Sequence, residues 1–121
     1  MKIETITQNG VTVAIIHSDT PILTDLQSAL DLIMTAKYEA GTKNIILNKE
    51  AVCEDFFILS TCLAGEVLQK FINYGVRFAI YGDFSGYTSK PLKDFIYESN
   101  KGKDVYFLPD PDSAVARLCG K

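Results

Sequence analysis

The chain has 121 residues, of which 47% are hydrophobic and 22% are charged, a balance typical of one soluble globular domain. Its formal net charge of −3 argues against a nucleic-acid partner, and no apolar run approaches the length of a membrane span. The N-terminus has no apolar signal core. We therefore expect a single domain over residues 1–121, located in the cytoplasm, with neither nucleic acid nor a membrane as its partner.

Two strands, Lys2–Gln8 and Val11–His17, are the first elements expected. The dipeptide Asn9-Gly10 between them is the strongest short-range signal for a β-hairpin. Apolar residues then recur at helical spacing, which predicts an amphipathic helix with Thr24 and Gln27 as its capping box and Gly41 as its end. Its apolar positions are Leu26, Ala29, Leu30, Ile33 and Met34.

The middle of the chain continues the alternation of strands and helices. Asn44–Asn48 has the composition of an inner strand, and the polar residues 49–55 lead out of the sheet. A broad apolar stripe over residues 59–74 predicts a second helix that packs on the sheet and ends at Gly75. The next strand expected is Val76–Tyr81.

The last third of the chain repeats the pattern. Leu92, Phe95 and Ile96 indicate a third helix that ends at residues 100–102, and Val105–Leu108 is the last strand. Asp112 or Ser113 can cap a C-terminal helix that runs through Leu118. The order β-β-α-β-α-β-α-β-α predicts an α/β fold, with a single mixed sheet of about five strands and about four helices, in which the N-terminal hairpin precedes parallel β-α units.

This order and spacing is similar to that of STAS domains, the sulfate-transporter and anti-sigma-factor-antagonist fold, over nearly the whole chain. In that family an Asp-Ser-Ser-Gly-Leu-Gly-like turn opens the second helix, and a partner kinase phosphorylates its serine or threonine. The comparable stretch here is Leu59-Ser60-Thr61-Cys62-Leu63-Ala64, in which the aspartate and both glycines are missing. The resemblance implies the fold, and we do not expect a phosphorylation switch at Ser60 or Thr61.

Several longer strings resemble a second family more closely, an uncharacterised group of short bacterial proteins known as domain of unknown function 4180. These strings are Leu63–Phe71, Gly82–Ser85, Tyr87–Lys90 and Asp94–Gly102. This resemblance implies no activity, cofactor or substrate.

The residues that most often carry chemistry are few. Cys53, Cys62 and Cys119 form no C-x-x-C pair, so we expect free thiols, with Cys62 and Cys119 buried in apolar helical patterns. The single histidine, His17, lies in the second strand and cannot supply a zinc site or a catalytic triad by itself. We therefore expect no metal, no cofactor and no catalytic residue.

Two carboxylate pairs are also present, Glu54 with Asp55 and Asp110 with Asp112. Each pair lies where a helix is expected to start, and negative charge is stabilising there. We assign both pairs to helix capping rather than to catalysis.

The stretch Gly82–Lys90 is the best candidate for a site. It leaves the sheet at the carboxyl end of a strand, which is where open α/β sheets bind ligands. Thr88, Ser89 and Lys90, beside the backbone N–H groups of the third helix, could hold a small anion. A simpler interpretation is that Gly82 makes a turn and Thr88 or Ser89 caps the helix, and we favour this one.

A ligand-binding or partner-binding surface is therefore predicted from the polar residues of this loop and of the third helix: Asp83, Ser85, Tyr87, Thr88, Ser89, Lys90, Tyr97 and Asn100. Because Tyr87 is expected to be exposed, its removal should cost less than about 1 kcal/mol of folding free energy.

Two functions remain open. One is a non-enzymatic, STAS-like regulatory or interaction module that binds a protein partner or a second copy of itself. The other is a protein or enzyme that binds a small, anionic ligand through the loop. We favour the first because the chain offers no set of nucleophile and base.

Overall fold

The computed structural model describes residues 1–120 and confirms the predicted α/β fold, with one mixed sheet of five strands and four α-helices. The elements are β1 Lys2–Gln8, β2 Val11–His17, α1 Leu26–Thr35, β3 Asn44–Asn48, α2 Leu63–Asn73, β4 Arg77–Tyr81, α3 Lys90–Lys101, β5 Val105–Leu108 and α4 Pro111–Cys119. A π-helical turn, Ala36–Ala40, extends α1 to Gly41, which adopts a left-handed conformation with φ of 63°.

The first two strands form the predicted hairpin. Asn9 and Gly10 both have positive φ, 54° and 76°, as a type I′ turn requires. The turn has two residues, so Gln8 and Val11 close it as a hydrogen-bonded pair, and the antiparallel register continues to Lys2 opposite His17.

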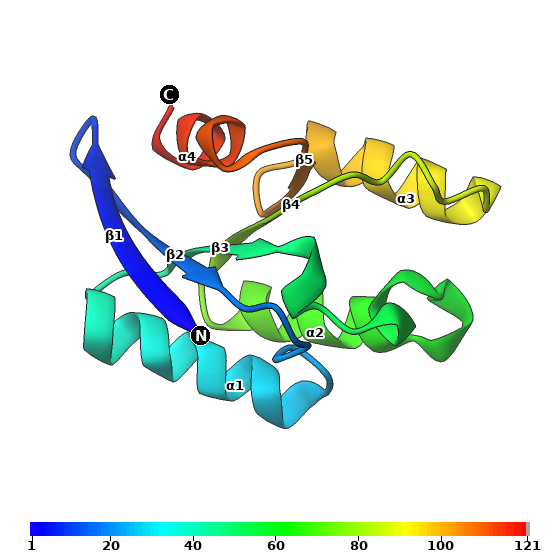
Figure 1. Cartoon of the computed structure of the whole chain (residues 1–121), viewed down its shortest axis with the longest axis horizontal. Helices are drawn as coiled ribbons and strands as arrows, with labels where there is room; N and C mark the ends of the chain where they lie inside the picture. Colours follow the sequence, from blue (N-terminus) through cyan, green and yellow to red (C-terminus); the bar gives the residue numbers. More distant parts are fainter. Residues whose placement is uncertain (121) are drawn as a thin grey trace.

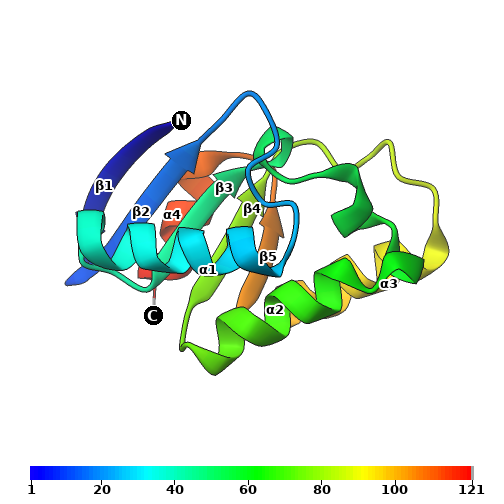
Figure 2. The same cartoon turned by 90° about the horizontal axis from the view of Figure 1, so that it is seen from below.

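The order of strands in the sheet follows the order of the chain. It runs β1-β2-β3-β4-β5, with β2 to β5 parallel. Right-handed crossovers that all advance in the same direction place their helices on the same face. Accordingly, α1 and α2 cover one face of the sheet, α4 covers the other, and α3 continues the first layer along the β5 edge (Figures 1 and 2).

The core therefore has two layers with the sheet between them. Alternate residues of each inner strand enter opposite layers, so that Ile45 and Leu47 of β3 pack under α1–α3 while Ile46 packs under α4. In the larger layer Phe71 of α2 meets Phe78 of β4 edge to face, with ring centroids 4.7 Å apart.

The helices do not all begin where the sequence predicted. The N-cap of α1 is Asp25, which accepts a hydrogen bond from Ser28 N at 2.8 Å, while Ser28 Oγ accepts from Asp25 N at 3.0 Å. The predicted capping box of Thr24 and Gln27 is therefore wrong by one residue. The capping box forms at Asp25 because Ser28, three residues on, completes it.

The C-terminal helix also begins earlier than predicted. Asp110 is the N-cap of α4, and its carboxylate accepts a hydrogen bond from Ser113 N at 2.7 Å. Pro111 follows in the first turn, where its missing N–H costs nothing. Asp112 and Ser113 therefore lie inside the helix.

The second helix begins at Leu63 instead of residue 59. Leu59–Thr61 forms a separate 3₁₀ turn, and Cys62 adopts a left-handed conformation with φ of 65°, which separates this turn from α2. Cys62 is exposed at this break, so the prediction that it is buried in a helical pattern is wrong; Cys119 is buried as predicted.

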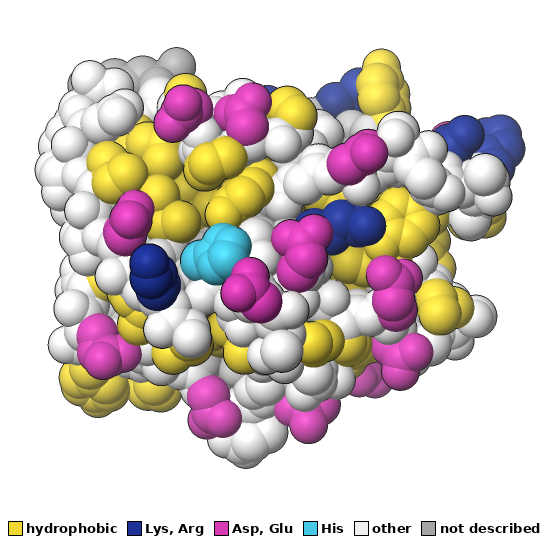
Figure 3. All heavy atoms as spheres, viewed as in Figure 1, with side chains coloured by type: hydrophobic (Ala, Val, Ile, Leu, Met, Phe, Trp, Pro, Cys, Tyr) yellow, Lys and Arg dark blue, Asp and Glu magenta, His cyan; other side chains and the backbone are white. Residues whose placement is uncertain are grey.

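One face of the molecule shows hydrophobic side chains between the β1–β2 hairpin and α4, bordered by acidic side chains, a basic side chain and the histidine (Figure 3). None of the helices within residues 1–120 combines the length and the apolar character needed to cross a membrane.

The core position of α2 leads to a first prediction. Leu68 is 7% exposed, and its replacement in Leu68→Ala should cost about 2–5 kcal/mol of unfolding free energy because it leaves a cavity under the helix. Glu66→Ala, on the exposed side of the same helix, should change stability by less than about 0.5 kcal/mol. Chemical denaturation compares the two, and equal losses would contradict this packing.

Candidate functional site

A cavity of about 540 Å³ lies at the carboxyl edge of the sheet, between the segment that follows β3 and the loop that follows β4. We call it the carboxyl-edge pocket. The starts of α2 and α3 flank it, because both helices return from this edge of the sheet (Figure 2). Its lining residues are Glu54, Phe57, Ile58, Leu59, Ser60, Gly86, Tyr87, Thr88, Ser89, Pro91 and Leu92.

Aromatic contacts hold the two sides of the pocket together. The ring of Phe57, from the first segment, stacks on Tyr87, from the second, with centroids 5.1 Å apart and planes at 22°. Phe57 also meets Phe84 at 6.0 Å, and Phe84 meets Phe107 of β5 at 5.6 Å. Each such pair contributes about 0.5–1.5 kcal/mol beyond its burial, so the chain of rings fixes both segments on the sheet.

The two segments that form the pocket also approach each other closely at the backbone of Gly82. Gly82 has φ of 157°, and a Cβ on it would lie 2.7 Å from the Cβ of Lys49. Glycine is therefore required where the loop after β4 passes the segment after β3. The same approach leaves Lys49 Nζ 4.9 Å from the centroid of the Tyr87 ring, a cation–π contact.

The phenol of Tyr87 is the most strongly perturbed titratable group of the pocket. Its hydroxyl donates a long hydrogen bond, 3.4 Å, to Glu54 Oε1. Burial, followed by the charge of Glu54 and this hydrogen bond, raises the pKa of Tyr87 to about 12. The phenol is therefore a protonated donor at neutral pH.

Glu54 is exposed at the pocket, and no lysine, arginine or histidine within residues 1–120 lies within 4.0 Å of its carboxylate. Lys49 instead lies over the ring of Tyr87. The pocket thus has apolar walls and a carboxylate that lacks an ion-pair partner.

Three of the predicted site residues, Tyr87, Thr88 and Ser89, line the pocket. Ser89 also caps α3, as its hydroxyl accepts a hydrogen bond from Leu92 N at 3.4 Å. The N–H of Lys93 is bonded to Ser89 O, and Pro91 has none. The start of α3 therefore offers few free donors to an anion.

Asp83 and Ser85 interact with each other outside the pocket lining. Asp83 Oδ1 accepts hydrogen bonds from Ser85 Oγ at 2.6 Å and from Ser85 N at 2.9 Å, and these bonds lower the pKa of Asp83. The pair forms a local turn that shapes the loop.

The predicted residues of α3 lie away from the pocket lining. Lys90 pairs with Asp94 at 2.8 Å on the surface, and Tyr97 is 62% exposed with Lys101 Nζ 4.3 Å from its ring centroid. Asn100 donates to Phe107 O at 3.0 Å and accepts from Phe107 N at 2.7 Å, which fastens α3 to β5.

The sequence patterns did not indicate one side of the pocket. Glu54 was assigned to the exit from the sheet and to helix capping, Leu59 and Ser60 to the second helix, and Phe57 and Ile58 to no element; Lys49 was not singled out. The adjacent Phe56 and Phe57 were the available signal, because two large aromatic side chains in a polar stretch indicate packing against another segment. Both are buried.

Other chemistry-bearing residues lie elsewhere. His17 is exposed at the end of β2, with Nε2 4.0 Å from Asp19 Oδ1. Within residues 1–120, no three His, Cys, Asp or Glu side chains gather as a metal ion would require.

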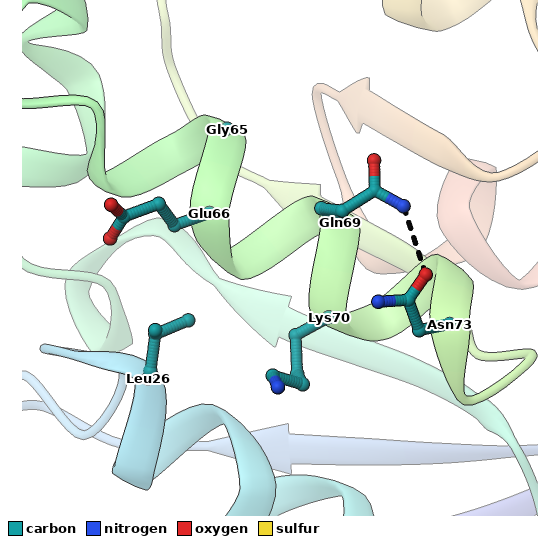
Figure 4. Close-up of a pocket in the computed structure, with 6 residues that line it drawn as sticks. All are labelled: Leu26, Gly65, Glu66, Gln69, Lys70 and Asn73. Carbon is teal, nitrogen blue, oxygen red and sulfur yellow. Dashed lines mark hydrogen bonds between the residues drawn. The ribbon is translucent and has the colours of Figure 1, made fainter.

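A second hollow, of about 400 Å³, lies between α2 and the start of α1 (Figure 4). Its lining comes from the exposed side of α2 and from Leu26. Gln69 Nε2 donates to Asn73 Oδ1 at 2.9 Å along the exposed side of α2, and this hollow has no aromatic wall of the kind that lines the carboxyl-edge pocket (Figure 4). We therefore take the carboxyl-edge pocket as the candidate site.

Comparison with known proteins gives one match. Residues 8–118 match the family model described as "Domain of unknown function (DUF4180)". No curated protein and no solved structure matches the chain.

The raised pKa of Tyr87 predicts a difference in alkaline stability. Below about pH 10 the phenol is protonated in both folded and unfolded chains; above it, only the unfolded chain loses the proton until the pH nears 12. The unfolding free energy of the wild type should therefore fall more steeply between about pH 10 and pH 12 than that of Tyr87→Phe. Chemical denaturation at several pH values measures this.

Glu54→Gln removes one cause of the shift and should reduce the extra pH dependence. Identical curves for the wild type and Tyr87→Phe would show that the phenol of Tyr87 is not perturbed.

Proposed function

The chain belongs to the family described as domain of unknown function 4180, whose description names no activity, and we propose from the geometry of its pocket that it is a non-enzymatic protein-interaction module. In this proposal the carboxyl-edge pocket takes up a lysine or arginine side chain of a partner protein. The module acts in the cytoplasm, in a regulatory role of the STAS-like kind.

The observation that carries this proposal is the unpaired carboxylate of Glu54 beside apolar walls. Lysine and arginine combine a long apolar stem with a terminal cation, so they match such a pocket in both respects. The stem would contact Phe57 and Tyr87, and the cation would pair with Glu54.

The surroundings of the pocket favour a protein as the source of this side chain. Ile58, at the pocket, is 48% exposed, and hydroxyl groups of Ser60, Thr88 and Ser89 surround the apolar walls. An apolar centre with a polar rim is the usual composition of a protein interface. These hydroxyl groups also have no histidine beside them to act as a base, because the single histidine, His17, lies on the α4 side of the sheet.

One observation favours a second candidate, a small-molecule ligand in the same pocket. The volume of about 540 Å³ falls within the range of about 300–1,000 Å³ typical of ligand sites. The charge of Glu54 then favours a cationic or neutral ligand over an anionic one.

The test uses a matched pair of probes on the full chain: the N-acetyl methylamide of arginine and that of citrulline, its neutral isostere. In NMR titrations the arginine probe should shift amide signals of residues 54–60 and 86–92, and citrulline should shift them less. Glu54→Gln should weaken the arginine probe about two- to fivefold, the effect of an exposed ion pair. Asp55→Asn, which changes the adjacent carboxylate outside the pocket, should leave the affinity unchanged.

Affinity capture from the native host then separates a protein partner from a small ligand. A partner should be retained in full by Asp55→Asn and in clearly smaller amount by Glu54→Gln. Arginine and citrulline probes that shift the same signals equally would overturn the cationic side chain, and capture that is insensitive to Glu54→Gln would overturn this pocket as the binding surface.

A further inference from the structure

The two edge strands of the sheet differ in how their outer backbone groups are satisfied. On the β5 edge, Gly82 N donates to Leu108 O and Phe78 N to Asp104 O, so the N–H and C=O of Phe107 point away from β4. The side-chain amide of Asn100 bonds both of these groups, at 2.7 and 3.0 Å. A side chain of α3 therefore closes this edge as another strand would.

The β1 edge has no such cover. Because Gln8 and Val11 close the two-residue turn as a hydrogen-bonded pair, Gln8, Ile6, Glu4 and Lys2 direct their backbone groups to β2. The N–H and C=O groups of the alternate residues, Ile3, Thr5 and Thr7, therefore point outward. Within residues 1–120, β2 is the only strand that pairs with β1.

The strand also lacks the features that usually protect an edge. It pairs with β2 over seven residues without a bulge, it contains no proline, and from Thr5 onward it carries no charged residue. Its central residues include threonine and isoleucine, which favour extended backbone. Such an edge accepts another strand.

We propose that the occupant is a second copy of this chain, with the two β1 strands antiparallel and related by a twofold axis at Thr5. In this register Thr5 meets Thr5, and Ile3 meets Thr7 of the second copy. The outward groups of all three residues then pair, which gives about six backbone hydrogen bonds. The two five-stranded sheets become continuous.

Self-complementarity selects this register and this occupant. A shift to the register centred on Glu4 would place two carboxylates directly opposite each other, which is destabilising. A register shifted toward the hairpin turn would leave Ile3 with no partner residue in the β1 strand of the second copy. The Thr5-centred register uses the whole strand and opposes no like charges.

Analytical ultracentrifugation of the full chain tests the proposal. The wild type should show a concentration-dependent mass approaching twice 13.4 kDa. Thr5→Pro should be a folded monomer, because the Thr5 N–H points away from β2 and its loss affects the outer edge alone. Thr5→Val keeps this N–H and should remain a dimer.

A cross-link provides a second readout that does not depend on Thr5→Pro folding. In a background with Cys53→Ser and Cys62→Ser, Thr5→Cys should form an interchain disulfide, since directly opposite Cα atoms lie about 5.5 Å apart. Thr7→Cys should not, because its counterpart would lie roughly 13 Å away along the strands.

Three results would overturn the proposal: a wild type that stays monomeric at every concentration, a dimer that survives Thr5→Pro, or disulfide formation by Thr7→Cys as efficient as that by Thr5→Cys. A monomeric wild type would leave the edge to a strand from a different protein.

Discussion

The stacking of Phe57 on Tyr87 is the contact on which the site depends. It joins two segments, after β3 and after β4, that have little regular backbone pairing of their own, and Phe84 connects them to Phe107 in the sheet. These rings hold the two walls of the pocket against each other and against the sheet. Tyr87 therefore contributes to stability as well as lining the proposed binding surface, and its removal should cost more than the loss of about 1 kcal/mol that its predicted exposure implied.

The order of the strands explains why the pocket needs this support. In a sheet whose strand order reverses, neighbouring loops diverge and leave a crevice. Here the order runs from β1 to β5 without reversal, so α1 and α2 pack side by side on one face and α3 follows them at the β5 edge. The hollow instead forms where the irregular segments before α2 and α3 keep these two helix starts apart.

Local sequence patterns predicted the fold well and the site only in part. Alternating strands and helices, the Asn9-Gly10 turn and the end of the first helix at Gly41 all follow from residue type and spacing, and the structure confirms them. Tyr87 was placed in the site because its loop is polar and near a helix start. Its partner Glu54 lies 33 residues earlier, and no local pattern indicates which distant segments will meet. Asn100 shows the same limit, since its polarity suggested a surface role while its amide serves the edge of β5.

Helix α3 takes part both in the pocket and in the cover of one edge of the sheet. Its start, at Ser89 and Pro91, forms part of the pocket, and Asn100 near its end closes the β5 edge. The edge left open to a further strand is therefore β1, which is separated from the pocket-bearing strands β3 and β4 by β2. A dimer formed there leaves both pockets open. Two weak sites on one rigid body bind a partner that carries two cationic side chains far more tightly than either site alone, because the second contact is intramolecular. In such a dimer, an exposed ion pair of modest strength at each pocket would suffice for the function proposed above.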